Sequence, residues 1–328
     1  MKRRNTLGLL LALGTLQRPS SAQLPTRAQR IGWLATDSAA APTTNLFLAA
    51  FRRGMDELKW VEGRDYVLDV RYANDNPQAI PGLADELVAS RPDLLIAPAD
   101  LQARMLKQRT TTIPIVFAIS VDPVGSGLVE SLQRPGGNVT GMTNQLNELG
   151  PKRLQLLKEA FPRVANVGVP YEPNDPSSAA QAKTVEDAAR VLGLRLTLIE
   201  LRQPAEIAAA FERATALGIE AYLPVAGRLV VSQRQAIVDQ VMRSKLPAIY
   251  GVSQYPDSGG LMSYGPNVLD NFRRAAGFVD KILKGTRPGD LPTQQPTQYE
   301  MVINMKTARA MGFALPQSVM LRADRVIE

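Results

Sequence analysis

The chain has 328 residues with no Cys and no His, and its 38 Lys and Arg against 31 Asp and Glu give a formal net charge of +7. Without Cys there is no disulfide, no thiol nucleophile, no zinc–thiolate centre and no lipid-modified cysteine anchor. Without His there is no Ser-His-Asp triad and no imidazole ligand for a metal ion. Chemistry based on carboxylate pairs, Ser-Lys, Tyr or oxygen-bound Mg²⁺ stays open. The length predicts two domains.

Residues 1–22 predict a secretory signal peptide. Lys2, Arg3 and Arg4 precede an apolar stretch at 7–16, and small residues then lead to a cleavage site after Ala22. The apolar stretch is shorter than the about 20 residues that span a bilayer. A buried N-terminal helix is the alternative interpretation, and the paired arginines leave the twin-arginine export route open.

The net positive charge belongs largely to this leader. Four basic residues and no acidic residue lie within 1–22, so the mature chain is only weakly basic. It carries no stripe of Lys and Arg interleaved with aromatic residues, which is the pattern typical of nucleic-acid binding. We therefore expect no nucleic-acid partner.

From residue 30 onward, short buried runs that predict strands alternate with apolar residues at the spacing of helices. The first series has strands at 30–35, 66–72, 94–97 and 113–119 and helices at 45–59, 77–90 and 101–109. A Pro-Gly-Gly-Asn turn at 135–138 then precedes a strand at 139–142 and a helix at 147–160. The second series has strands at 164–169, 195–200, 219–225, 247–250, 261–264 and 299–303, and helices at 177–191, 204–217, 230–243, 267–284 and 306–311.

Strands separated by helical patterns predict right-handed βαβ units and parallel sheets. Two successive series of this kind predict an α/β protein with two Rossmann-like lobes. A single eight-fold βα barrel is the alternative, because the number of strands separates the two architectures poorly. Trp33 lies in the middle of the first strand, so we expect it in a core and not at a ligand.

Several motifs in a fixed order resemble one group of bacterial ABC-transporter substrate-binding proteins, which includes tryptophan- and tyrosine-binding members. They are DPVGSGLV at 122–129, RPGGNVTG at 134–141, LPAIY at 246–250, GLMSYGP at 260–266, VDKILKG at 279–285, Leu291-Pro292 and LRAD at 321–324. The resemblance covers the chain from about Arg30 to its end. It implies a type I periplasmic-binding-protein fold, in which two lobes joined by a hinge of three crossings hold a ligand between them. We expect lobe one at 28–143 plus 266–292 and lobe two at 144–265 plus 293–328.

A ligand of an open parallel sheet binds outside the carboxyl ends of the strands, where the N–H groups of helix N-termini suit a carboxylate. The candidate ligand-binding residues therefore follow the predicted strands or lie at predicted crossings. In lobe one they are Thr36, Asp37, Ser38, Asp100, Ser120 and Asp122. In lobe two they are Tyr171, Glu172, Asn174, Arg228 and Tyr250, and at the crossings Asn144, Ser263 and Tyr264.

Each candidate also has a purely structural interpretation. Asp37, Ser38 and Asn174 suit turns and helix caps, and Asp122 suits the start of a turn. The two tyrosines that follow strands, at 171 and 250, suit packing as well as stacking on a ligand. Arg228 fits a solvated helix face as well as a ligand carboxylate.

Two loops depart from the pattern of the resembled family. Residues 98–101 read Pro-Ala-Asp-Leu where relatives carry a Gly-Gly-Thr-Pro-like loop, and Glu172 stands where relatives commonly carry Asn. Our hypothesis is that Asp100 and Glu172 add negative charge to the cleft and favour a ligand with an amine. The alternative is that either residue faces solvent or caps a helix. For the carboxylate of such a ligand, the candidate donors are Ser38, the helix N-terminus after it and Arg228.

No dinucleotide fingerprint, phosphate-binding loop, Gly-x-Ser-x-Gly elbow or EF-hand loop occurs in the sequence. We therefore expect no catalytic residues, no cofactor and no metal. The prediction is a monomeric periplasmic component of an ABC importer that captures an amino acid or similar organic solute and delivers it to a permease in the inner membrane. A ligand-sensing protein that feeds a receptor is one alternative, and a secreted enzyme on the same fold is another.

Overall fold

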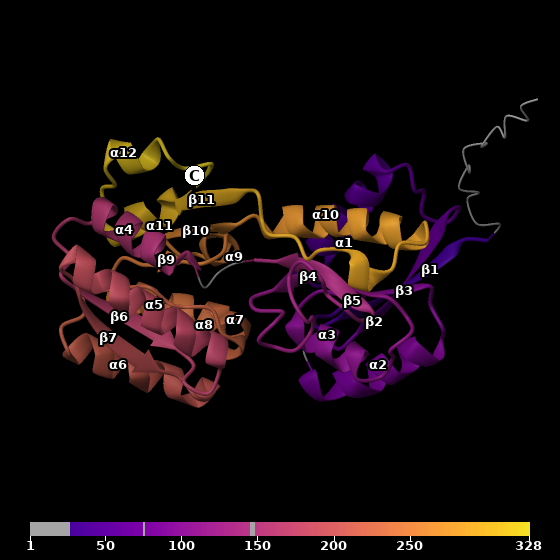
Figure 1. The fold of residues 1–328 in the computed structure, drawn as a ribbon. Helices are drawn as coiled ribbons and strands as arrows, with labels where there is room; N and C mark the ends of the chain where they lie inside the picture. The colour runs from indigo at the N-terminus through magenta and orange to yellow at the C-terminus, as the bar shows by residue number, and fades with distance from the viewer. Residues whose placement is uncertain (1–26, 75, 145–147) are drawn as a thin grey trace, which may run out of the picture.

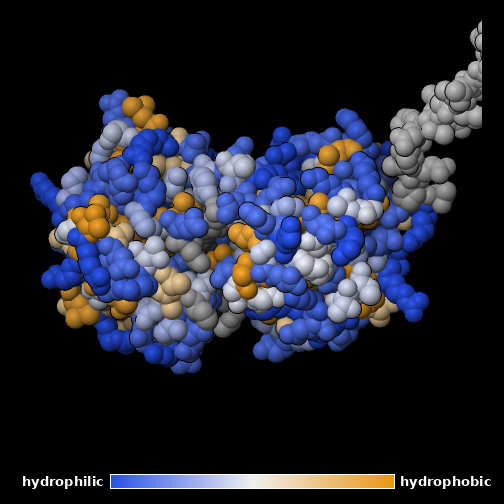
Figure 2. Space-filling model, in the orientation of Figure 1, coloured by the Kyte–Doolittle hydropathy of each residue, from blue (hydrophilic) through white to orange (hydrophobic). Residues whose placement is uncertain are grey.

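A computed structural model describes residues 27–74, 76–144 and 148–328. The chain forms two lobes that share no sheet, and the outline of the molecule narrows where the lobes meet (Figure 1, Figure 2). The predicted signal peptide at 1–22 lies outside the described residues. None of the helices in the described ranges is long and apolar enough to cross a membrane.

Lobe one contains a five-stranded sheet in the order β2-β1-β3-β4-β5, and every neighbouring pair is parallel. Its strands are β1 (Gln29–Ala35), β2 (Tyr66–Tyr72), β3 (Leu94–Ala97), β4 (Ile115–Ser120) and β5 (Val139–Thr143). Its helices are α1 (Pro42–Glu57), η1 (Pro77–Ala79), α2 (Ile80–Ala89), α3 (Asp100–Lys107), α10 (Val268–Leu283) and η4 (Pro288–Asp290).

Lobe two contains a three-stranded sheet, β7-β6-β8, and a four-stranded sheet, β12-β11-β10-β9. A parallel bridge between Tyr222 and Ala248 connects the two sheets. The strands are β6 (Asn166–Tyr171), β7 (Arg195–Glu200), β8 (Ala221–Tyr222), β9 (Ile249–Tyr250), β10 (Met262–Pro266), β11 (Tyr299–Asn304) and β12 (Arg325–Ile327). The helices are α4 (Gly150–Ala160), α5 (Pro176–Leu192), η3 (Pro204–Glu206), α6 (Ile207–Ala216), α7 (Arg228–Ser232), α8 (Arg234–Ser244), α9 (Gln254–Asp257), α11 (Met305–Met311) and α12 (Gln317–Met320).

The predicted fold class is confirmed, and the alternative of a single barrel is wrong because the strands form separate sheets in two lobes. The predicted strand at 219–225 is shorter, with only two residues in β8. The predicted helix at 230–243 begins earlier and divides at Gln233 into α7 and α8. The sequence analysis did not predict α9, α12 and β12, which have only three or four residues each and so show little periodicity.

The chain passes between the lobes three times. It leaves lobe one after β5, returns between β10 and α10, and crosses again between η4 and β11. The first and third crossings are hydrogen-bonded, because Thr143 N donates to Gln294 O at 2.8 Å. The second is tied to the first, because Asn271 Nδ2 donates to Thr143 O at 3.3 Å. The three crossings therefore form one hydrogen-bonded hinge.

Lobe one takes part of its core from α10, which follows most of lobe two in sequence. The Phe272 ring stacks on Trp33 with centroids 5.7 Å apart and on Phe47 at 4.1 Å. Helices α1 and α10 cross closely because Gly54 has no Cβ, which would overlap the carbonyl oxygen of Arg273. Trp33 is fully buried, so the expectation that it belongs to a core is confirmed.

Replacing Phe272 with Ala is expected to lower the free energy of unfolding by about 3–5 kcal/mol, because it removes a fully buried ring and leaves a cavity. Equilibrium denaturation of the ligand-free protein measures the loss. Val191→Ala is the control, since the Val191 side chain in α5 is 88% exposed and its loss is expected to change stability by less than about 0.5 kcal/mol. Equal losses in the two variants would show that α10 does not support lobe one.

Candidate functional site

The crossings determine which edge of the lobe-one sheet faces which edge of the sheets in lobe two. The carboxyl end of β5 leads into lobe two, and β1 to β4 run parallel to β5. The carboxyl end of β10 leads into lobe one, and β9, β8, β6 and β7 run in the same direction as β10. The carboxyl ends of these strands therefore point toward the opposite lobe, where a ligand of a parallel α/β sheet binds.

In lobe one, three hydrogen bonds join polar residues along this edge. Gln102 Nε2 in the first turn of α3 donates to Thr36 Oγ1, which follows β1. Asp100 Oδ2 accepts a hydrogen bond from Val121 N, just after β4, at 3.3 Å. The carbonyl oxygen of Ser120 accepts one from Asn144 N at 2.9 Å. We call Thr36, Asp100, Gln102, Ser120, Thr143 and Asn144 the lobe-one polar row.

Several atoms of this row are buried and have no hydrogen-bond partner in the described residues. They are Asp100 Oδ1, Gln102 Oε1, Ser120 Oγ, Thr143 Oγ1 and Asn144 Oδ1. Buried polar atoms in folded proteins are nearly always paired, since an unpaired one costs about 1–3 kcal/mol. A concentration of unpaired atoms at the edge that faces the other lobe is therefore a feature of a binding site.

Asp37 and Asp122, two acids that follow strands of lobe one, accept hydrogen bonds from residues nearby in the chain. Asp37 Oδ2 accepts a hydrogen bond from Thr44 Oγ1 at 3.2 Å, which fixes the loop before α1. Asp122 is exposed, and its Oδ1 accepts a hydrogen bond from Gly125 N at 2.8 Å, as in the turn that the sequence suggested. The Ser38 carbonyl accepts from Ala41 N, the cap residue of α1, and no side chain caps that helix.

In lobe two, Glu172 contacts a helix N-terminus of its own lobe. The residue is 7% exposed, and its Oε1 accepts hydrogen bonds from Leu229 N at 2.5 Å and Val230 N at 3.2 Å. Gly227 precedes the helix, and a Cβ there would overlap the Glu172 carboxylate. The helix-cap role that the sequence left open as an alternative is therefore the one that the carboxylate performs at α7.

The candidate tyrosines have different surroundings. Tyr250 is fully buried and stacks on Tyr255 with ring centroids 4.4 Å apart, which is the packing role. Tyr171 is partly exposed, and its hydroxyl donates to Glu200 at 3.3 Å. Tyr264 is partly exposed beside Tyr299, with ring centroids 6.3 Å apart. Tyr171 and Tyr264 thus remain partly accessible to solvent, whereas Tyr250 does not.

The other candidates in lobe two are placed as follows. Ser263 lies within β10 and is fully buried, with an unpaired hydroxyl in the described residues. Asn174 is exposed in the loop before α5. Arg228 begins α7, and its side chain lies outside the described part of the chain. In lobe one, hydrogen bonds thus connect candidates at neighbouring strand ends, and in lobe two Glu172 bonds the helix that Arg228 begins.

Gln102, Thr143 and Val252 belong to this region and were absent from the sequence-based candidates. Gln102 is 2% exposed in the first turn of the helix that follows β3, a position that the predicted strand end already implied. Thr143 is the last residue of β5. Val252 packs against the cores of both lobes, which no local pattern in the sequence indicates.

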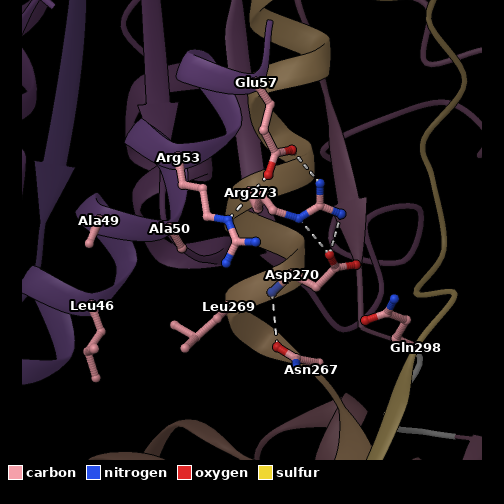
Figure 3. A pocket seen from close by; sticks show the side chains of 10 residues that line it. All are labelled: Leu46, Ala49, Ala50, Arg53, Glu57, Asn267, Leu269, Asp270, Arg273 and Gln298. Carbon is pink, nitrogen blue, oxygen red and sulfur yellow. Dashed lines mark hydrogen bonds and ion pairs between the residues drawn. The ribbon is translucent and has the colours of Figure 1, made fainter.

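A separate groove of about 610 Å³ follows the outer face between α1 and α10 (Figure 3). Arg273 crosses it and bonds Glu57 and Asp270, both at 2.7 Å, and the hydrogen bond from Arg273 lowers the pKa of Glu57. Arg53 also bonds Glu57 at 3.3 Å. Arg273 therefore pairs α10 with α1, whereas Arg53 pairs with Glu57 within α1. No cluster of three possible metal ligands occurs among the described residues.

Two lobes with facing strand ends, a triple hinge and an unpaired polar row define a two-lobed ligand-binding protein. A solved ABC domain in complex with L-Trp from Streptococcus pneumoniae is 26% identical, and the match has a TM-score of 0.82 and covers 92% of this chain and 100% of that one. The ligand-free, open structure of a substrate-binding protein with adhesive properties from Clostridium difficile is 22% identical, with a TM-score of 0.72 and coverage of 92% and 99%. The fold is that of type I periplasmic binding proteins.

The family is also shown by sequence. The model of the family described as ABC transporter substrate binding protein matches residues 41–327, so the chain belongs to this family. A curated tyrosine-binding protein of Clostridioides difficile (strain R20291) is 25% identical over 270 residues, which are 82% of this chain and 77% of that protein. The family and these relatives are binding proteins.

Glu172→Ala is expected to destabilise the ligand-free protein by about 1–3 kcal/mol, because the α7 N–H groups lose a buried, charged acceptor. Chemical denaturation provides the measurement. Glu212→Ala in α6 is the matched control, since Glu212 is an exposed acid of the same lobe. A Glu172 variant as stable as the Glu212 variant would contradict the capping role.

Proposed function

We propose that this chain is the periplasmic solute-binding component of an ABC importer, that it holds an amino acid between its two lobes, and that it passes the ligand to a permease in the inner membrane. The observation that carries the proposal is the lobe-one polar row, with its unpaired buried atoms at strand ends that face lobe two. Family membership supports the transport role.

The relatives support an aromatic amino acid as the ligand. One of them is a tyrosine-binding protein and another was solved in complex with L-Trp. In this chain, Tyr171 and Tyr264 offer partly exposed rings for an aromatic side chain. The N-terminus of α1 has no side-chain cap, so its N–H groups suit the ligand carboxylate.

Capture in this proposal needs only binding and closure. In the open state a solute reaches the polar row, and rotation about the three crossings brings the strand ends of lobe two over it. The unpaired polar atoms then exchange an unfavourable buried state for hydrogen bonds to the ligand. Closure also removes water from the ligand, which strengthens these hydrogen bonds.

Thermal unfolding in the presence of individual amino acids tests the binding role. A ligand at 100 times its dissociation constant is expected to stabilise the protein by about 2.7 kcal/mol, which raises the midpoint by several degrees. L-Trp and L-Tyr are expected to give the largest shifts, and native mass spectrometry of freshly purified protein identifies any ligand already bound. The absence of a shift with every amino acid would contradict the proposal.

Uptake and processing in the native bacterium test the transport role. Deleting the gene is expected to abolish high-affinity uptake of the radiolabelled ligand, and a plasmid copy is expected to restore it. The protein recovered from the periplasm is expected to begin at Gln23, which intact mass measures. Normal uptake in the deletion strain, with ligand binding intact, would favour the sensor alternative.

A further inference from the structure

We propose that Asp100, together with Gln102 and Asn144, forms a subsite in lobe one that binds a primary ammonium group of the ligand. The inference rests on the proposed function, since it assigns one end of the bound solute to named atoms. The two acids that the sequence suggested for the cleft have different roles in this proposal. Asp100 has a carboxylate oxygen available for a ligand, whereas Glu172 caps a helix.

The hydrogen bonds of the row place the three residues at the carboxyl ends of neighbouring strands, with the Gln102 amide bonded to Thr36 after β1. Asp100 contacts Val121 N on one side of the β4 end, and Asn144 N contacts the preceding Ser120 carbonyl on the other. Gln102 lies in the same first turn of α3 as Asp100. The subsite residues therefore lie along the carboxyl ends of β1, β3, β4 and β5, which follow one another in the sheet.

The unpaired atoms of the subsite are of one chemical kind. Asp100 Oδ1, Gln102 Oε1 and Asn144 Oδ1 accept hydrogen bonds and cannot donate them, and none has a partner in the described residues. Gln102 and Asn144 are only 2% and 3% exposed. An ammonium group offers three donors and no acceptor, so it matches three unpaired acceptors in number and in charge.

The carboxyl group of Asp100 is held in a site that disfavours its charge until a cation arrives. Burial raises its pKa above the usual range, and the charge of Asp122 acts in the same direction. The Ser120 hydroxyl, Val121 N and the charge of Arg104 lower the pKa by less. The Ser120 hydroxyl thus interacts with the carboxyl group, but no hydrogen bond joins Ser120 Oγ to Asp100 Oδ1 in the described residues.

A structural role explains only one of the two carboxylate oxygens of Asp100. Oδ2 accepts from the backbone of the neighbouring strand end and holds α3 against β4. An Asn side chain at this position keeps such an acceptor, so Asp100→Asn preserves the structural contact and removes only the negative charge and an acceptor. The substitution thus separates a ligand role from a structural one.

The test compares amino acids with analogues that lack the amine, by isothermal titration calorimetry. The probes are L-Trp and 3-(indol-3-yl)propionate, and L-Tyr and 3-(4-hydroxyphenyl)propionate. The wild-type protein is expected to prefer the amine-bearing member of a pair, and Asp100→Asn is expected to reduce that preference about tenfold or more. Glu86→Gln is the matched control, because it makes the same charge change at an exposed residue of α2, near the opposite end of lobe one.

The outcomes separate the subsite from the proposed function. If the wild-type protein binds the amino acids but Asp100→Asn keeps the same preference as Glu86→Gln, the ammonium subsite is wrong and the binding function stands. If the wild-type protein binds neither member of either pair, the aromatic amino-acid function is wrong and the subsite assignment fails with it. If Asp100→Asn loses the preference for the amine-bearing probe and Glu86→Gln keeps it, the result supports both the ammonium subsite and the binding function.

The stability of the ligand-free variants provides a readout that needs no ligand. Asp100→Asn is expected to unfold at the same denaturant concentration as the wild-type protein or at a higher one, because it removes a buried, unpaired charge. A clear loss of stability relative to Glu86→Gln would show that Asp100 acts as a structural residue and would overturn the subsite.

Discussion

The packing of Phe272 between Trp33 and Phe47 is the contact on which the architecture depends. It requires α10 to complete lobe one, although α10 follows most of lobe two in the chain. The chain must therefore return from lobe two and cross again to form β11. A two-lobed protein with one linker would leave its lobes free to rotate in many directions, whereas three hydrogen-bonded crossings restrict the motion to a hinge. The return of α10 to the core of lobe one thus gives the molecule its three hydrogen-bonded crossings.

The same hinge is continuous with the candidate site. Thr143 is bonded through its N–H to Gln294 and through its carbonyl oxygen to Asn271, and the next residue, Asn144, belongs to the lobe-one polar row. The first crossing therefore carries both a hinge residue and a residue of the lobe-one polar row at consecutive positions. A ligand that bonds Asn144 would contact the residue next to Thr143 in the hinge. Binding at this position and movement of the lobes would therefore involve the same segment of the chain.

The strand ends of lobe one could be predicted from the sequence because apolar runs such as 94–97 stop abruptly at polar loops. The partners of the polar residues could not. Asp100 and Glu172 each follow a strand, yet Glu172 caps α7, whose first N–H groups lie 57 and 58 residues further along the chain. Tyr250 was a candidate for stacking on a ligand, but it stacks on Tyr255 of α9, a four-residue helix without detectable periodicity. Both outcomes depend on tertiary contacts that local patterns do not contain.

The two lobes differ in how they treat the helix N-termini and acids at their facing edges. In lobe two, Glu172 neutralises the start of α7, and Asp175 caps α5 by accepting from Ser177 N and Ser178 N. In lobe one, α1 and α3 begin without a side-chain cap. Glu172 and Asp175 of lobe two are thus bonded to helix N–H groups of their own lobe, whereas lobe one keeps both uncapped helix N–H groups and an acceptor-rich carboxylate at the same edge. A zwitterion has one group for each, so the proposed function assigns its charged ends to lobe one and its side chain to lobe two, which has the partly exposed tyrosines.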